Sequence, residues 1–411
     1  MRDKIKKKIL SLLILSSTSL MAFSGTIYDA QSKKALQNAV IMDTKQRVYS
    51  DINGSFTINS RDKVIHIKAY GHKTFSFDSN SSKTELYIDP IRVKALYLTF
   101  WGASNNSKTF KKILKLLQET EANAIILDVK NEYGHTSFLT DFKQANSYGA
   151  HKRRTNRNIH KFIDLMHQNG IYTIARVVTF KDEIQASHNP QYAIKRDDNG
   201  TIWRNHDKMA WVDPYDTRAH EYTISIAQEA AKVGFDEINF DYIRFPAKSG
   251  LRFSKENTAE NRKEAIETFL QSAQKQLQPY GVFISVDTYG NVLWSRDDNN
   301  IGQTIESLSK YADYLAPMLY PSGFASGSFH VEYPADHPYK VIYRSIKHIQ
   351  NRIDLNRVRP WLQYFRDYKS KRRVYGKFEI QEQIRATDNL NTNGWMMWSP
   401  SSRYHKEYLT K

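Results

Sequence analysis

The pattern of apolar and polar residues changes near residue 93, after which short apolar runs alternate with segments of helical apolar spacing. The apolar runs predict eight β-strands, at residues 93–100, 123–129, 170–178, 235–241, 282–287, 313–320, 358–365 and 394–400. The periodic segments predict seven helices, at residues 109–122, 157–169, 217–233, 257–279, 301–312, 338–352 and 376–391. This alternation is typical of a parallel sheet, and eight units favour closure into a (β/α)8 TIM barrel over an open doubly wound sheet. We therefore predict an α/β fold whose barrel occupies residues 91–411.

Residues 23–90 consist of short alternating runs separated by turns, which predicts a small β-sandwich. Within this segment, Asn53-Gly54 lies between alternating apolar residues and predicts a hairpin. Four stretches resemble the carboxypeptidase regulatory-like domain, namely GTIYD (25–29), LQNAV (36–40), DINGSF (51–56) and AYG (69–71). The resemblance implies an accessory β module that carries no catalysis.

Residues 1–22 have the order of features found in a secretory signal peptide. Five basic side chains come first, an apolar run from Ile9 to Leu20 follows, and cleavage is predicted after Ala22. The run is short for a membrane span, and an uncleaved N-terminal anchor is the alternative. No later segment is apolar enough to span a membrane, and the chain has no Cys. The sequence therefore predicts a periplasmic or secreted protein without disulfides.

The formal net charge of the chain is +17 at pH 7. A basic surface suits an anionic partner such as an acidic polysaccharide, phospholipid headgroups or nucleic acid. Because an exported protein rarely meets nucleic acid, no nucleic-acid partner is predicted. Solvated surface lysines are the simplest explanation of the charge, and the sequence makes no prediction of an oligomeric state.

Polar and aromatic residues collect at the C-terminal ends of the predicted barrel strands, where a TIM barrel builds its active site. The carboxylates among them are Asp128 and Glu132 after the second strand, Asp241 on the fourth and Asp287 on the fifth. The other candidates are two arginines, a glutamine and aromatic residues: Trp101, Arg176, Tyr242, Arg244, Tyr289, Tyr320, Trp361, Gln363 and Trp398.

The chemistry of this set points to a sugar substrate. The chain lacks the GxxxxGK[ST], GxGxxG, GxSxG and HExxH motifs, so no cofactor and no metal are predicted. Paired carboxylates with flanking aromatic rings fit glycoside hydrolysis, in which one acid protonates the leaving oxygen and the other attacks or stabilises the anomeric carbon. For Lys130 or Asp182 taken singly, a salt bridge within the barrel mouth is predicted instead of a part in the chemistry.

Seven stretches of the barrel carry a resemblance to a known family. They are LDVKNEYG (127–134), YTIARVVTFKD (172–182), WVDPYDTRAHEY (211–222), EAAKVGFDEINFDYIRFP (229–246), APMLYPS (316–322), RPWLQYF (359–365) and GWMMWSPSSRY (394–404). Residues 93–404 resemble a bacterial family assigned by inference as glycoside hydrolases, distantly akin to the (β/α)8 glycosidases of the α-amylase type. The resemblance implies the same barrel and a glycosidase activity.

The α-amylase type also suggests roles for individual residues. Its nucleophile is an Asp at the end of strand four, a place that Asp241 holds here. Its general acid is a Glu on strand five, where this chain has Asp287. Its arginine two residues before the nucleophile is replaced by Asn239, and Arg244 follows Asp241 instead. Its Asp on strand seven is absent, and Gln363 stands nearby.

The hypothesis from the sequence is that Asp241 is the nucleophile or the carboxylate that stabilises the oxocarbenium ion. Asp287 is then the general acid/base, with a pKa raised by partial desolvation, and Asp128 and Glu132 are alternative acids. Either Arg176 or Arg244 would hold Asp241 ionised. The predicted sugar platforms are Trp101, Tyr242, Tyr320, Trp361 and Trp398.

Three classes of function remain open at this point. The first is an exported glycosidase whose substrate is a surface or matrix polysaccharide or oligosaccharide. The second is a carbohydrate-binding barrel without catalysis, which would keep the aromatic residues but not need two carboxylates. The third is a structural envelope protein, which gives no reason for polar residues to gather at one end of the barrel. The glycosidase accounts for both features.

Overall fold

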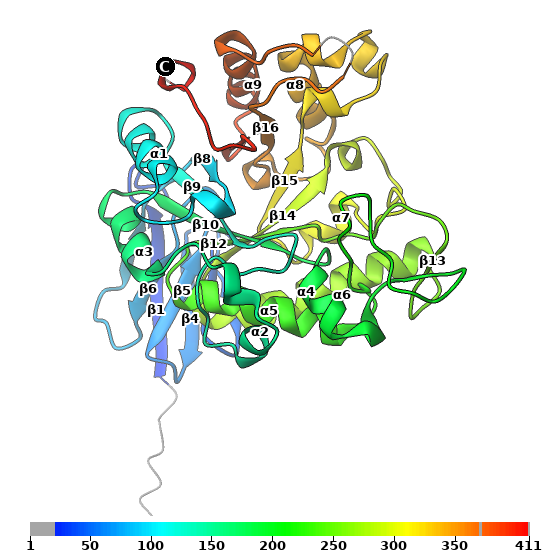
Figure 1. The fold of residues 1–411 in the computed structure, drawn as a ribbon. Helices are drawn as coiled ribbons and strands as arrows, with labels where there is room; N and C mark the ends of the chain where they lie inside the picture. The colour runs from blue at the N-terminus through cyan, green and yellow to red at the C-terminus, as the bar shows by residue number, and fades with distance from the viewer. Residues whose placement is uncertain (1–20, 370–371, 410–411) are drawn as a thin grey trace, which may run out of the picture.

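The computed structural model describes residues 21–369 and 372–409. Its centre is a closed barrel of eight parallel strands, in the order β10-β12-β14-β15-β16-β17-β8-β9 (Figure 1). The barrel strands are β8 (Val93–Leu98), β9 (Ala124–Lys130), β10 (Tyr172–Val178), β12 (Glu237–Asp241), β14 (Phe283–Tyr289), β15 (Tyr314–Met318), β16 (Trp361–Gln363) and β17 (Gly394–Trp398). The predicted (β/α)8 barrel is confirmed. In the described part of the chain, no helix is both long and apolar enough to cross a membrane.

Helices connect the strands and surround the barrel (Figure 1). The seven predicted helices are present as α1 (Lys108–Glu119), α3 (Ile159–Gln168), α5 (Thr217–Lys232), α6 (Ala259–Leu277), α7 (Ile305–Ser309), α8 (Pro338–His348) and α9 (Lys377–Asn389). Two short additional helices follow β9 and β10, namely α2 (Lys143–Ser147) and α4 (Glu183–His188). Asp216 caps α5, because its side chain accepts a hydrogen bond from the Arg218 N–H. Helix α7 begins later than predicted, because Gly302 has a positive φ and Thr304 is its cap.

Side chains of the barrel strands alternate between the barrel interior and the layer under the helices. On β12, Ile238 and Phe240 belong to the large apolar cluster that includes the helix faces. Asn239 and Asp241 point the other way and bond to partners on neighbouring barrel strands. The apolar residues that alternate with polar ones in this strand therefore face the helix layer, and the polar ones face the barrel interior.

The interior holds a buried ion pair near the N-terminal ends of the strands. Arg359 Nη1 lies 2.8 Å from Glu237 Oε2, and both side chains are almost fully buried. The Tyr172 hydroxyl donates to Glu237 Oε2 at 3.0 Å, and Arg359 also donates to the Asn393 side chain at 2.9 Å. Because every member has a buried partner, we assign this cluster a structural role.

Residues 21–88 form seven strands in two small sheets with an apolar cluster of their own, drawn in blue in Figure 1. The first sheet has the order β4-β1-β7 and the second β3-β2-β5-β6. The strands are β1 (Met21–Asp29), β2 (Val40–Met42), β3 (Arg47–Tyr49), β4 (Ser55–Ser60), β5 (Val64–Lys68), β6 (Phe75–Asp78) and β7 (Glu85–Ile88). Most of the predicted signal segment, residues 1–20, lies outside the described residues.

The predicted hairpin at Asn53-Gly54 is wrong, although the turn is present. Gly54 has a φ of 75°, and its N–H donates to the Asp51 carbonyl. The strands on either side belong to different sheets, because β3 pairs with β2 and β4 pairs with β1. The Gly54 carbonyl accepts from the Ile27 N–H, so tertiary contacts bind this turn to β1.

The N-terminal sheets dock against the N-terminal end of the barrel strands, opposite the end where Asp241 lies. Lys68 Nζ is 2.6 Å from Asp313 Oδ2, just before β15, and both residues are buried. The Gly71 N–H donates to the Tyr314 hydroxyl at 3.2 Å. These contacts cover the barrel at the N-terminal end of its strands. We propose the module boundary near residue 90, as the sequence suggests.

The Lys68–Asp313 pair makes this docking testable. Lys68→Met is expected to lower the free energy of unfolding by about 3–5 kcal/mol, because it leaves the buried Asp313 carboxylate without its cation. Urea unfolding of the full chain measures the change. Lys63→Met is the matched control, since its partner Asp78 is 3.9 Å away and exposed, and such pairs contribute about 0–1 kcal/mol. Equal effects of the two substitutions would contradict a buried, stabilising pair.

Candidate active site

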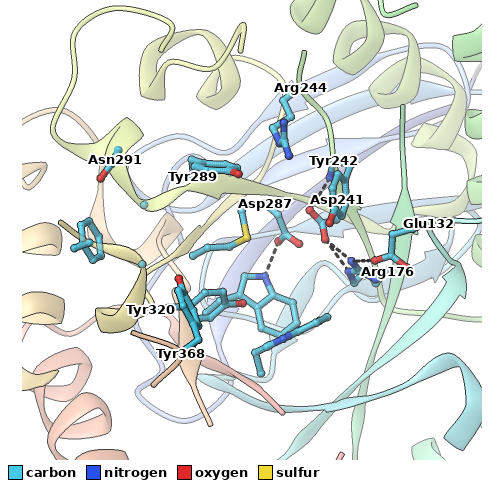
Figure 2. Close-up of a pocket in the computed structure, with 16 residues that line it drawn as sticks. Glu132, Arg176, Asp241, Tyr242, Arg244, Asp287, Tyr289, Asn291, Tyr320 and Tyr368 are labelled. Carbon is cyan, nitrogen blue, oxygen red and sulfur yellow. Dashed lines mark hydrogen bonds and ion pairs between the residues drawn. The ribbon is translucent and has the colours of Figure 1, made fainter. Parts of the chain in front are cut away.

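A pocket of about 380 Å³ opens at the C-terminal end of the barrel strands (Figure 2). Residues at strand ends and in the loops after them form its wall. They are Glu132, Arg176, Asp241, Tyr242, Arg244, Asp287, Tyr289, Gly290, Asn291, Met318, Tyr320, Gly323, Phe324, Trp361, Tyr368 and Trp398. The end of the barrel that holds this pocket is the one where TIM-barrel enzymes place their active sites.

Arg176 on β10 is the centre of a charge network at the base of the pocket. Its Nε donates to Asp241 Oδ2 at 2.9 Å, its Nη1 to Asp128 Oδ1 at 2.7 Å and its Nη2 to Glu132 Oε1 at 2.9 Å. The Arg176 side chain is only 2% exposed. One buried guanidinium therefore pairs with three carboxylates, and it is Arg176 rather than Arg244 that pairs with Asp241.

Asp128 and Glu132, the two carboxylates of the network other than Asp241, have different environments. Burial raises the pKa of Asp128 to about 6 despite the nearby Arg176 charge. Burial also acts to raise the pKa of Glu132, but the charge and hydrogen bond of Arg176 outweigh it and lower this pKa. Asp128 lies below the pocket, where the Tyr97 hydroxyl donates to its Oδ2 at 2.6 Å. Glu132 faces the pocket.

Asp241 is the last residue of β12, and the chain turns sharply after it. Tyr242 has a φ of 50°, in the left-handed region that bulky residues rarely adopt. The Tyr242 N–H donates to Asp241 Oδ1 at 2.6 Å. This turn places the Tyr242 ring in the pocket wall next to the carboxylate (Figure 2). Backbone strain of this kind often accompanies functional sites.

Asp287 lies beside Asp241 on the neighbouring strand. The strands pair at Phe240 and Val286, so each Asp is the residue immediately after the paired one. Asp287 Oδ1 accepts a hydrogen bond from Trp361 Nε1 at 2.7 Å. The Asn239 amide donates to the same oxygen at 2.9 Å. Burial, and then repulsion from the Asp241 carboxylate, raise the pKa of Asp287 well above its ordinary value.

Aromatic side chains enclose these carboxylates on several sides (Figure 2). Trp398 stacks on Tyr97 at a ring separation of 4.1 Å and lies 5.3 Å from the Arg176 guanidinium. Trp361 is buried and uses its N–H on Asp287. Tyr289 lines the pocket and is 46% exposed. The pocket therefore combines an apolar wall with a polar base.

Three residues predicted for the site do not line the pocket. Asp128 lies beneath it, and Trp101 is on the surface with 62% of its area exposed. Gln363 is fully buried and donates to Ser322 Oγ at 2.7 Å and the Phe365 carbonyl at 3.0 Å, so its amide connects two loops.

A salt bridge was predicted for Lys130 and for Asp182 individually, and the two residues form one with each other. Their Nζ and Oδ2 atoms are 2.9 Å apart, and both side chains are fully buried. Their charges therefore hold the loop after β10 against β9 and do not face the pocket. Within the described residues, no cluster of three or more His, Asp or Glu side chains could hold a metal ion.

Some of the pocket lining was not expected from the sequence. Asn291 lies in a short 3-10 helix after β14, and Phe324 and Tyr368 lie in irregular segments after β15 and β16. Tyr368 is 63% exposed and stacks on Phe365 at 6.2 Å. Strand periodicity locates strand ends but not loop residues farther along the chain, so it gives no signal for Tyr368, which lies five residues beyond the end of β16.

Comparison with protein families identifies the barrel. Residues 95–404 match the family model described as "Putative glycosyl hydrolase domain". The chain belongs to this family. The match covers all eight barrel strands except the first two residues of β8, and it includes each carboxylate of the pocket. A comparison with curated protein sequences found no match.

Several solved structures are similar to this chain. The glycoside hydrolase domain of PgaB (BpsB) from Bordetella bronchiseptica is 12% identical, with a TM-score of 0.54 over 76% of this chain and 95% of that chain. A hypothetical protein from Ruminiclostridium thermocellum ATCC 27405 is 34% identical, with a TM-score of 0.42 over 47% of this chain and 96% of that one. A chitinase from Bacteroides thetaiotaomicron is 10% identical, with a TM-score of 0.46, over 77% and 91%. The likeness to the Bordetella domain shows the barrel fold.

Proposed function

We propose that the protein is an exported glycoside hydrolase that cleaves a cell-surface or extracellular polysaccharide through Asp241 and Asp287. The observation that carries the proposal is the contrast between these adjacent carboxylates. Asp241 is paired with the permanent cation of Arg176, whereas Asp287 is buried against Trp361 and has a raised pKa. Two neighbouring carboxyl groups with opposite environments are the arrangement that acid and base roles require.

In this proposal, Asp287 is protonated when the sugar binds and donates its proton to the glycosidic oxygen. Asp241 attacks the anomeric carbon or stabilises the positive charge that develops there. Asp287 is then a carboxylate and accepts a proton from the water that completes hydrolysis. Arg176 orients Asp241 through two hydrogen bonds from one guanidinium. Glu132 is the alternative acid that also faces the pocket.

The aromatic wall supports a sugar substrate. Tyr242, Tyr289, Tyr320, Trp361 and Trp398 surround the two carboxylates. Rings of this kind present flat apolar faces, on which the C–H faces of a sugar pack while the hydroxyl groups reach the polar base. We assign Tyr242, Tyr320 and Trp398 to sugar binding and Trp361 mainly to positioning Asp287.

The proposed activity is tested by incubating the purified protein with polysaccharides from bacterial envelopes and extracellular matrices and measuring new reducing ends. The expected result is release by the wild type and none by Asp241→Asn. Binding without release would instead favour the non-catalytic carbohydrate-binding barrel. Neither binding nor release across the panel would overturn both functions.

Export is the second part of the proposal. Residues 1–22 have the features of a signal peptide, and the mature chain is expected to begin near Phe23. Cleavage after Ala22 would leave the pairing of β1 with β4 from Phe23 to Thr26 intact. Mass spectrometry of protein from the periplasm or the medium measures the terminus. Intact Met1 on membrane-bound protein would contradict cleavage and support the anchor.

We also propose that residues 23–90 are an accessory module of the carboxypeptidase regulatory-like type. Two small sheets and a separate apolar cluster support this assignment. The module docks at the end of the barrel away from the pocket, so it has no direct part in the proposed chemistry.

A further inference from the structure

Arg244 lies in the wall of the pocket, three residues beyond Asp241. Its guanidinium carbon is 5.0 Å from the centre of the Trp211 ring, 5.3 Å from that of Tyr242 and 4.9 Å from that of Tyr289. Figure 2 shows the guanidinium between Tyr242 and Tyr289, on the same side of the pocket as both rings. Three ring contacts fix the position of this cation.

The hydrogen-bonding capacity of Arg244 is largely unused. Its Nη1 donates to the Phe245 carbonyl at 3.1 Å, and no carboxylate in the described part of the chain forms an ion pair with it. A guanidinium has five N–H donors in a planar fork. Arg176 differs sharply, because its three nitrogens donate to three carboxylates.

The charges around the pocket are therefore arranged in two groups. On one side, Arg176 is surrounded by Asp128, Glu132 and Asp241, so negative groups outnumber positive ones. On the other side, Arg244 supplies a positive charge without an acidic partner. Aromatic rings compensate a partly buried cation less fully than an anion does. A substrate with an anionic group would satisfy Arg244 and would avoid Asp241, so its orientation would be fixed.

We infer that Arg244 binds an anionic substituent of the sugar in this pocket, a carboxylate or a sulfate, so that the substrate is an acidic polysaccharide. The inference rests on the proposed glycosidase function and names its substrate class. The planar fork of arginine matches the geometry of two oxygens on one anionic group. The full chain has a net charge of +17, and it stays basic after the proposed loss of residues 1–22, which carry five basic side chains and one acidic one. This charge also attracts a polyanionic chain.

The test uses matched substrates. A panel of uronate-containing polysaccharides is compared with the same polymers after chemical reduction of the carboxylates to alcohols, and sulfated polymers are compared with their desulfated forms. The wild type is expected to prefer the anionic member of one pair. Arg244→Gln should lower kcat/KM on that member by about 10- to 100-fold, as expected for loss of a charge-assisted hydrogen bond. On the neutral member, the effect should stay within about 3-fold.

Two further variants distinguish binding of the anion by Arg244 from attraction by the overall positive charge of the protein. Arg244→Lys keeps the charge but not the fork, so it should restore part of the preference. Arg385→Gln removes the same charge from the outer surface of α9, where Arg385 pairs with Glu382. It should leave the preference unchanged. The pair on which the preference appears tells whether the anion is a carboxylate or a sulfate.

The outcomes distinguish the inference from the function on which it depends. Hydrolysis of neutral polymers alone, or equal losses on both members of a pair for Arg244→Gln, would overturn the inference and leave the glycosidase standing. If no polymer is cleaved, the proposed function fails, and calorimetric binding of the same pairs to wild type and Arg244→Gln decides. Equal binding, or no binding of any anionic member, would then overturn the role of Arg244.

Discussion

Asp241→Asn is expected to reduce turnover by about 10⁴-fold or more while the protein stays folded. The substitution is nearly isosteric and removes the negative charge that the transition state needs. Arg176 would still pair with Asp128 and Glu132, at 2.7 and 2.9 Å. The buried cation is therefore not left alone, and the stability cost should be smaller than the about 3–5 kcal/mol expected when a sole partner is lost. Activity and thermal unfolding are measured on the same preparation.

Asp298→Asn provides the matched control for this prediction. Asp298 is a buried partner of Arg262, at 2.6 Å, and does not line the pocket. Its replacement should lower stability by about 3–5 kcal/mol and leave the turnover of the folded fraction unchanged. If Asp241→Asn behaved in the same way, with residual activity following the folded fraction, Asp241 would be a structural partner of Arg176 and not a catalytic group.

Asp287→Asn is expected to lower the cleavage of polysaccharides by about 10²- to 10⁴-fold, because the general acid is lost. The amide oxygen can still accept the hydrogen bonds that Trp361 and Asn239 now give to Oδ1. The pocket should therefore keep its shape. Aryl glycosides of the responsive sugar with activated leaving groups need no proton, so their cleavage should fall much less. Equal losses across leaving groups of different pKa would argue against the acid role and direct attention to Glu132.

The pH profile gives an independent check on Asp287. Burial and the Asp241 charge raise the pKa of this carboxyl. A general acid must hold its proton, so activity should persist above the ordinary carboxyl pKa of about 4 and be lost only as pH rises through the raised pKa. On activated substrates, Asp287→Asn should remove this alkaline loss. If the variant lost activity at high pH as the wild type does, a group other than Asp287 would be responsible for that loss.

The fold could be predicted because its signals are local. Each barrel strand is a short apolar run, each helix has its own period, and Asp216 caps α5 as its sequence position suggests. The pairing between strands was harder to predict from the sequence. The Asn53-Gly54 turn is present, but β3 and β4 join different sheets, because contacts with β1 decide their partners.

The site was predictable in part for the same reason. Parallel strands end at one rim of a barrel, so Asp241 and Asp287 could be placed at the same end from their positions alone. The directions in which the side chains point could not be predicted from these positions. The left-handed turn at Tyr242 sends Arg244 toward three aromatic rings, although it is only three residues from Asp241.

The barrel, the end at which its polar residues gather, and the carboxylates at the ends of strands four and five can all be located from the order of residues. The cation that each carboxylate meets depends on how the strands are arranged in the folded chain. Arg176 reaches Asp241 across 65 residues of sequence because their strands are neighbours in the barrel. Likewise, Trp361 donates to Asp287 from another strand, whereas Gln363, two residues later, is used to hold loops. Side-chain pairs of this kind depend on distances in space, and these cannot be read from the spacing of residues along the chain.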